Sequence, residues 1–93
     1  MTTSWHVQLK RSAAKSYEKL PEDIKAAVDA LAMEMKLTGP VRGNWKNYSK
    51  LGQDMHHCHL RGGKPTYVAC WEAKKKERII EVYYVGTHEK APY

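Results

Sequence analysis

The sequence predicts an α+β fold in which an N-terminal strand and a two-helix hairpin precede an antiparallel β-meander, with the helices packed on one sheet face. Three observations support this prediction. Residues 5–9 alternate large apolar with polar side chains, which is typical of a half-buried strand. Residues 24–35 repeat apolar side chains at helical spacing, and three strand-like runs fill the second half of the chain. The 93 residues are enough for one small domain, 1–93.

The N-terminal strand should turn Trp5, Val7 and Leu9 toward a core. Ser12 can cap a short helix that runs from Ala13 to Leu20. A second helix then begins at Pro21, which suits the first position of a helix, and ends at Gly39-Pro40. Its apolar face consists of Ile24, Ala27, Val28, Leu31 and Met35. Because the link is so short, we expect the two helices to form an antiparallel hairpin on the sheet.

The meander follows a basic loop, Val41 to Gly52, that leads into a short strand. Trp45 in this loop and Trp71 are expected to pack in or beside the core. The three main strands are expected over Met55–Arg61, Thr66–Glu72 and Arg78–Gly86, with turns at 62–65 and 74–77.

Charge and composition narrow the classes of function. Sixteen Lys and Arg against ten Asp and Glu give a net charge of +6, which favours a polyanionic partner such as nucleic acid. No apolar run is long enough to span a membrane, and residues 1–10 lack the apolar core of a signal peptide, so we expect a cytoplasmic protein. In that reducing compartment Cys58 and Cys70 should be free core thiols.

The densest polar cluster lies in the strand at 55–61. Strand alternation places His56, Cys58 and Leu60 on the helix side, and sends His57, His59 and Arg61 to the open face. The open row has three readings: a solvated polar face, a metal site that lacks clear third and fourth ligands, or an anion site where Arg61 holds phosphate and histidine exchanges protons.

Residues distant in the sequence favour the anion site. His88 follows the last strand and could approach the histidine row, while Tyr93 either frays at the terminus or folds back over the sheet. The side chains of Lys46, Lys50 and Lys64 could track a phosphate backbone. The lysines at 74–76 are better explained as a solvated turn.

Three segments together resemble the RelE/ParE superfamily of bacterial toxins. They are Gly43-Asn44-Trp45-Lys46-Asn47-Tyr48, His57-Cys58-His59-Leu60-Arg61, and Val85-Gly86-Thr87-His88-Glu89 followed by Tyr93. The last is similar to the ending of YafQ-type members, and the likeness extends over nearly the whole chain. The resemblance implies a toxin of a type II toxin–antitoxin system, a ribosome-dependent mRNA endoribonuclease that inhibits translation.

The resemblance also implies a chemistry that uses neither a cofactor nor a catalytic metal. The RNA's own 2′-OH attacks the adjacent phosphate, leaving a cyclic phosphate and a free 5′-OH. His59 is expected as general base, with His57 able to share this role, and His88 as general acid, although these labels are exchangeable. Arg61 would contact phosphate, and Tyr93 matches the family's terminal aromatic residue. Lys64-Pro65-Thr66-Tyr67 departs from the early arginine of many members, which leaves transition-state charge to Arg61 or Lys64.

The implied partners are mRNA in the ribosomal A site and a cognate antitoxin, a small DNA-binding protein whose acidic or amphipathic segment folds on the basic surface. Two other functions stay open. One is a ParE-like inhibitor of DNA gyrase, which needs no histidine cluster. The other is an RNA- or ribosome-binding module without turnover.

Overall fold

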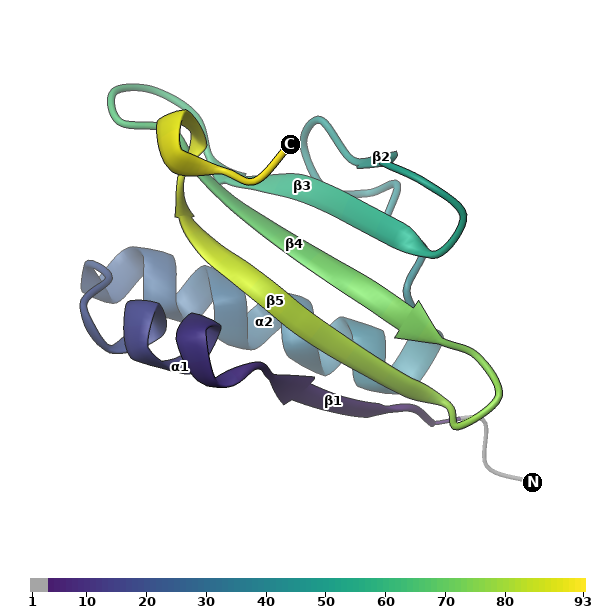
Figure 1. The fold of residues 1–93 in the computed structure, drawn as a ribbon. Coiled ribbons are helices and arrows are strands. Elements are labelled where there is room, and N and C mark those ends of the chain that lie inside the picture. Colours follow the sequence, from purple (N-terminus) through teal and green to yellow (C-terminus); the bar gives the residue numbers. More distant parts are fainter. Residues whose placement is uncertain (1–3) are drawn as a thin grey trace.

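A computed structural model describes residues 4–93 and has the α+β architecture that the sequence predicts. A five-stranded sheet carries two helices, and a short 3₁₀ helix follows the last strand (Figure 1). The elements in chain order are β1 (His6–Leu9), α1 (Arg11–Glu18), α2 (Glu22–Thr38), β2 (Ser49–Lys50), β3 (Met55–Arg61), β4 (Tyr67–Lys74), β5 (Ile79–Thr87) and η1 (His88–Lys90).

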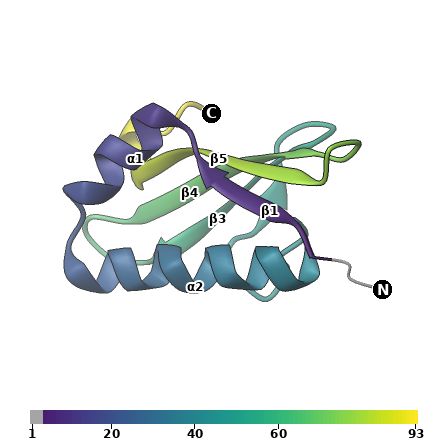
Figure 2. The ribbon, with the colours of Figure 1, turned by 90° about the horizontal axis from the view of Figure 1, so that it is seen from below.

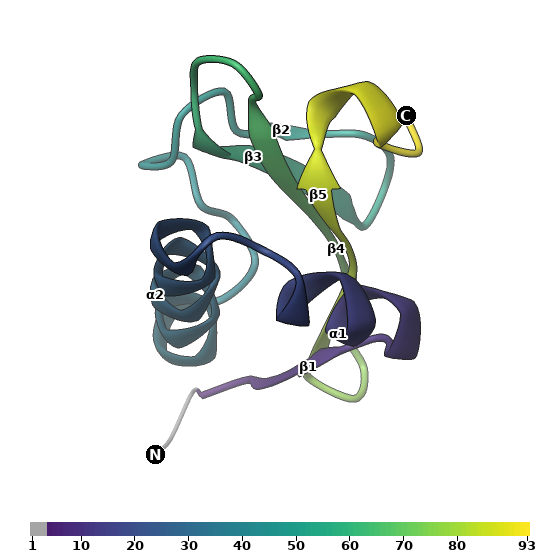
Figure 3. The ribbon, with the colours of Figure 1, turned by 90° about the vertical axis from the view of Figure 1, so that its left-hand side faces the viewer.

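The sheet has the order β1-β5-β4-β3-β2, so that β4 lies at its centre. Strands β2 to β5 form the antiparallel meander, while β1 pairs in parallel with β5. Strand β1 covers only residues 79–82 of β5, and α1 lies beside the rest of that strand (Figure 1). Helix α2 runs along one face of the sheet, and neither α1 nor α2 covers the opposite face of β3 and β4 (Figures 2 and 3).

The core lies between α2 and the sheet. The predicted spacing is confirmed on α2, whose buried residues are Ile24, Val28, Leu31 and Met35. The sheet contributes its helix-facing side chains, namely Cys58, Ala69, Trp71, Ile80, Val82 and Val85. Trp5, Val7 and Leu9 pack against this core from the N-terminal strand, as the alternation predicted. Both cysteines are buried and free, which also agrees with the prediction.

Trp71 fills the centre of the core and joins it to the loop after α2. Its indole N–H donates to the Pro40 carbonyl at 3.0 Å, and its ring lies parallel to the ring of His56, with centroids 5.8 Å apart. His56 is 2% exposed, and its Nδ1 lies 2.7 Å from the Tyr48 hydroxyl. His56 is therefore a satisfied core histidine on the helix side, where strand alternation placed it.

The start of each helix differs from the prediction, and so does the way the two helices pack. Helix α1 begins at Arg11, so Ser12 lies inside it, and the N-cap position belongs to Lys10, which makes no side-chain cap. The expected Ser12 cap is therefore wrong. Pro21 is the N-cap of α2 rather than its first residue. The chain reverses between the helices, but α1 packs mainly on β5 while α2 packs on β1 and β3.

A β-bulge changes the course of β3. His59 pairs with Val68 of β4, but Arg61 pairs with Tyr67, so Leu60 has no partner of its own. The extra residue shifts the alternation that follows it. Residues before the bulge keep the predicted faces, whereas Arg61 does not.

Among residues 4–93, neither helix has the length and apolar character of a membrane span.

Candidate active site

The open face of β3 presents His57 and His59, as strand alternation predicted. Both side chains are half-buried, and their ring centroids lie 6.4 Å apart. The cross-strand partners on β4 are Cys70 for His57 and Val68 for His59, so a small apolar side chain stands beside each ring on the open face. These small neighbours leave the rings room to approach groups that cross over the sheet.

The chain segment after β5 brings His88 to His59. The two ring centroids lie 5.5 Å apart in an edge-on arrangement. His59, Val68 and Gly86 form one row across three strands, so no large side chain stands between His59 and the end of β5. The backbone N–H of His88 donates to the carbonyl of Thr66 at 2.8 Å, which fixes the start of η1 over the beginning of β4. β5 lies beside β4 rather than β3, and η1 covers the remaining distance (Figure 1).

The C-terminus returns over the sheet and places Tyr93 on the histidines. Its ring lies 4.5 Å from His57 and 5.8 Å from His88, measured between centroids. Tyr93 is 49% exposed, and the Nδ1 atom of His57 is fully buried without a hydrogen-bond partner. Of the two alternatives for Tyr93, the structure therefore has the folded-back phenol. We call His57, His59, His88 and Tyr93 the histidine cluster.

Electrostatics hold part of the cluster neutral. Burial is the main cause that lowers the pKa of His57, and the nearby His59 and His88 lower it further. Burial also lowers the pKa of His59, with added effects from His88 and Lys46. Burial raises the pKa of Tyr93, so its phenol keeps its proton. At neutral pH the cluster thus holds proton acceptors and a proton donor next to each other.

Arg61 does not join the open-face row, and this prediction is wrong. After the bulge its guanidinium pairs with the Asp23 carboxylate at the start of α2 and lies over the Tyr67 ring, 5.3 Å from its centroid. Tyr67 packs against the helix-side core, so these contacts draw Arg61 toward the helices and away from the histidines.

The three predicted RNA-binding lysines lie in different places. Lys46 is closest to the cluster, because its carbonyl accepts the His59 N–H at 2.8 Å and its ammonium lies beside Gly62. Lys64 lines a cleft next to His88. Lys50 is in register with His56 at the edge of the sheet, so it lies toward the helix side. Lys46 and Lys64 are therefore the lysines nearest to the histidine cluster.

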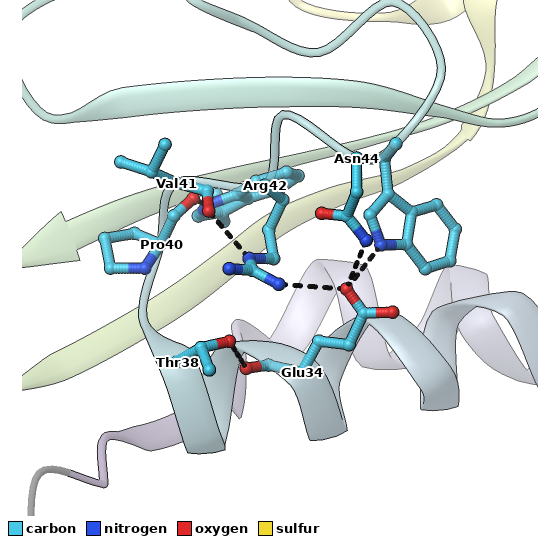
Figure 4. A network of polar contacts seen from close by, with 8 residues as sticks. Glu34, Thr38, Pro40, Val41, Arg42 and Asn44 are labelled. Carbon is cyan, nitrogen blue, oxygen red and sulfur yellow. Dashed lines mark hydrogen bonds and ion pairs between the residues drawn. The ribbon is translucent and has the colours of Figure 1, made fainter.

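A carboxylate that the sequence did not single out holds the loop that carries Lys46. One oxygen of Glu34, on α2, accepts from Arg42, Asn44 and the indole N–H of Trp45 at 3.0, 2.9 and 2.8 Å (Figure 4). These hydrogen bonds lower the pKa of Glu34. We call Glu34 with its three partners the loop brace. The only signal in the sequence is an acidic residue on α2 that precedes a basic loop by about two turns.

No metal-binding group of three or more His, Cys, Asp or Glu side chains occurs in residues 4–93. The metal reading of the histidine row therefore lacks the further ligands that zinc needs. What the cluster can do chemically is acid–base catalysis, because two imidazoles within reach of one group can take and give a proton in the same reaction.

No protein-family model and no curated protein matches the sequence. Solved structures do match. The free form of a double mutant of E. coli RelE toxin is 18% identical with a TM-score of 0.76, over 96% of this chain and 88% of that one. The E. coli RelBE complex is 16% identical with a TM-score of 0.73, over 94% and 100%. The archaeal RelE–RelB complex of Pyrococcus horikoshii is 13% identical with a TM-score of 0.69, over 96% and 100%. The chain has the fold of RelE toxins, as the sequence resemblance implied.

Proposed function

We propose that this chain is the toxin of a type II toxin–antitoxin system and that it cleaves mRNA in the ribosomal A site. The observation that carries the proposal is the approach of His59 and His88, whose rings lie 5.5 Å apart although 28 residues separate them in the chain. A merely solvated strand face needs no such convergence. The fold of RelE toxins agrees with the proposal.

In the proposed reaction the 2′-OH of one nucleotide attacks the adjacent phosphorus, and the bond from phosphorus to the 5′ oxygen of the next nucleotide breaks. His59 takes the proton of the 2′-OH, because its lowered pKa keeps the imidazole neutral. His88 gives a proton to the leaving 5′ oxygen. The products are a 2′,3′-cyclic phosphate and a free 5′-OH, and no further reactant is needed.

The remaining cluster residues have supporting roles in this proposal. His57 can share the role of base through the ring nitrogen that is not buried, since its Nδ1 is enclosed. Tyr93 keeps its proton, so its hydroxyl can donate a hydrogen bond to the RNA, and its ring can stack on a base.

Positive charge for the transition state comes from Lys46 in this proposal. Arg61 is engaged by Asp23, whereas the Lys46 ammonium lies beside Gly62 and close enough to lower the pKa of His59. A cation at this position stabilises the extra negative charge that the phosphorane-like transition state develops.

An antitoxin partner is part of the proposal. Two of the similar structures are complexes of RelE with RelB. The net charge of +6 suits an antitoxin segment that is acidic or amphipathic and that folds as it binds.

The test is cleavage of a defined mRNA by the purified chain, with and without ribosomes, read by primer extension. We expect cuts that depend on ribosomes, and a loss of about 10²- to 10⁴-fold in rate for His59→Ala and for His88→Ala. His6→Ala, which removes an exposed histidine from β1, is the matched control and should cleave as the wild type does. Full activity in both cluster variants would contradict the proposal.

The two other functions give different results. Binding of RNA without cut ends would point to a module without turnover. In cells that express the chain, DNA damage with intact mRNA would point to gyrase instead.

A further inference from the structure

A cleft that His88 helps to line lies between the β3–β4 turn and the start of η1. It has a volume of about 760 Å³, within the range of small-molecule sites. Its walls are the β3–β4 turn and the end of β5 with η1, and its lining residues are Gly63, Lys64, Pro65, Thr66, Thr87, His88 and Glu89. The cleft is therefore continuous with the proposed general acid.

One hydrogen bond joins the two walls of the cleft, and one more lies within each wall. The Thr66 carbonyl accepts the His88 N–H at 2.8 Å, and the Thr66 hydroxyl donates to the Gly63 carbonyl at 2.6 Å. On the β5 side, the Tyr84 hydroxyl donates to the Thr87 carbonyl at 2.7 Å. These bonds fix the backbone on both sides, so the cleft is a built feature.

Its charged side chains are not used by the protein itself. Within residues 4–93, neither Lys64 nor Glu89 has an ion-pair or hydrogen-bond partner. Both side chains are exposed, so they are available to a ligand. A carboxylate repels phosphate and accepts hydrogen bonds, so the ligand group that suits Glu89 is one that donates them.

We propose that this cleft holds the nucleobase next to the cleaved phosphate and that Glu89 selects guanine there. The inference rests on the proposed function. Guanine is the RNA base whose Watson–Crick edge has two adjacent donors, N1–H and the 2-amino group, which match the two carboxylate oxygens. Adenine and cytosine place a ring acceptor beside their amino group, and uracil has one donor between two carbonyls. Bases of single-stranded RNA expose this edge to a protein.

The other lining residues suit the same ligand. The Pro65 ring offers an apolar face for the base, and Lys64 at the rim can pair with the flanking phosphate. With the base in the cleft, its phosphate lies toward His88, so recognition would bring the scissile bond to the proposed general acid.

The experiment compares the wild type with Glu89→Gln, which keeps the size of the side chain. Cut sites in ribosome-dependent digests of a mixed mRNA pool are mapped by sequencing the new 5′ ends. We expect guanine beside the cut to be favoured on the order of 10-fold by the wild type. The Glu89→Gln variant should lose this preference and gain adenine sites, because an amide matches the donor and acceptor of adenine. Glu77→Gln, at the β4–β5 turn, is the matched control and should keep the preference for guanine.

A second measurement separates the cleft from the nuclease. The amide signals of Thr66 and Thr87 are followed by NMR while guanosine or adenosine monophosphate is added to the free protein. Larger shifts with the guanosine nucleotide that are lost in Glu89→Gln would support the cleft proposal. If the same protein cut no mRNA, the proposed function alone would be contradicted. Cleavage without base preference, together with equal shifts for both nucleotides, would overturn the cleft proposal and leave the nuclease intact.

Discussion

At the scale of single residues, one bulge decides where Arg61 lies, and strict alternation predicted the wrong face for its side chain. A strict strand alternation over 55–61 places Arg61 beside His57 and His59. The bulge at Leu60 breaks this alternation, and nothing in the sequence marks it, since neither glycine nor proline stands there. The histidines were predictable because they precede the bulge, where the period of two still holds.

The contrast between Lys46 and Arg61 can be measured with matched variants. Lys46→Met keeps the length of the stem and removes the charge, and we expect it to slow cleavage by about 10- to 10³-fold, a range typical of one lost transition-state donor. Arg61→Met should keep most of the cleavage rate, because its guanidinium is paired with Asp23. It should cost at most about 1 kcal/mol in stability, since this ion pair is partly exposed. Single-turnover cleavage rates on ribosomes compare the two. A larger loss in Arg61→Met than in Lys46→Met would contradict this assignment.

The pH dependence of the cleavage rate tests independently whether Lys46 lies close to His59. Burial, His88 and Lys46 together lower the pKa of His59, so His59 loses its proton below its ordinary pKa of 6.5. The rising limb of the cleavage rate, which reports the loss of the His59 proton, should therefore lie below pH 6.5. Lys46→Met should raise the pKa of His59 and move this rise to higher pH. NMR titration of the ring signals measures the pKa directly, and a pKa that moves downward would be the contrary result.

At the scale of elements, the loop between α2 and β2 was the weakest part of the sequence pattern. Residues 41–48 show no period, and their order comes from the loop brace on α2 (Figure 4). Sequence reasoning has no means to assign three donors to one helix carboxylate, because Glu34 looks like any solvent-facing acid on an amphipathic helix. The long helix and the three main strands, by contrast, follow from their periods and were predicted to within a few residues.

Glu34→Gln tests whether the loop brace positions Lys46. An amide oxygen is a weaker acceptor than a carboxylate, so all three donors lose strength together, and we expect a loss of about 1–3 kcal/mol in stability. The amide of His59, which bonds the Lys46 carbonyl, should exchange faster with solvent. Glu22→Gln at the exposed start of α2 is the matched control and should change neither quantity. An unchanged exchange rate of the His59 amide in Glu34→Gln would show that the loop brace does not position Lys46.

The lowered pKa of Glu34 determines how its contribution to stability changes with pH. A carboxyl whose pKa is lower in the folded state stabilises the fold at pH values above its unfolded pKa, and this contribution is lost as the pH falls through the folded pKa. The difference in stability between the wild type and Glu34→Gln should therefore be full near neutrality and shrink in acid. Chemical denaturation at several pH values measures it.

At the scale of the whole molecule, the sheet separates a core histidine from the histidines of the open face. His56 faces the helices as part of the core, while His57 and His59 face the open side. All three have a lowered pKa, and burial is the first cause in each case. The unfolded chain regains the ordinary histidine pKa of 6.5 and so binds more protons than the folded chain just below that pH. Protonation of the unfolded chain must therefore weaken the fold as the pH falls.

The stability of the wild type should thus decline from pH 7 toward pH 5, and His56 should account for part of the slope. Below pH 6.5 His56 binds a proton in the unfolded state but not in the folded state. The free energy of unfolding therefore falls with pH until the pKa of the folded state is reached. The double variant Tyr48→Phe with His56→Phe removes the imidazole and its hydroxyl partner together and keeps the flat stack on Trp71. Its denaturation midpoint should change less between pH 7 and pH 5 than that of the wild type or of Tyr48→Phe alone. An equal slope in the double variant would assign the pH dependence to the open-face histidines, and His57→Gln with His59→Gln should then flatten it.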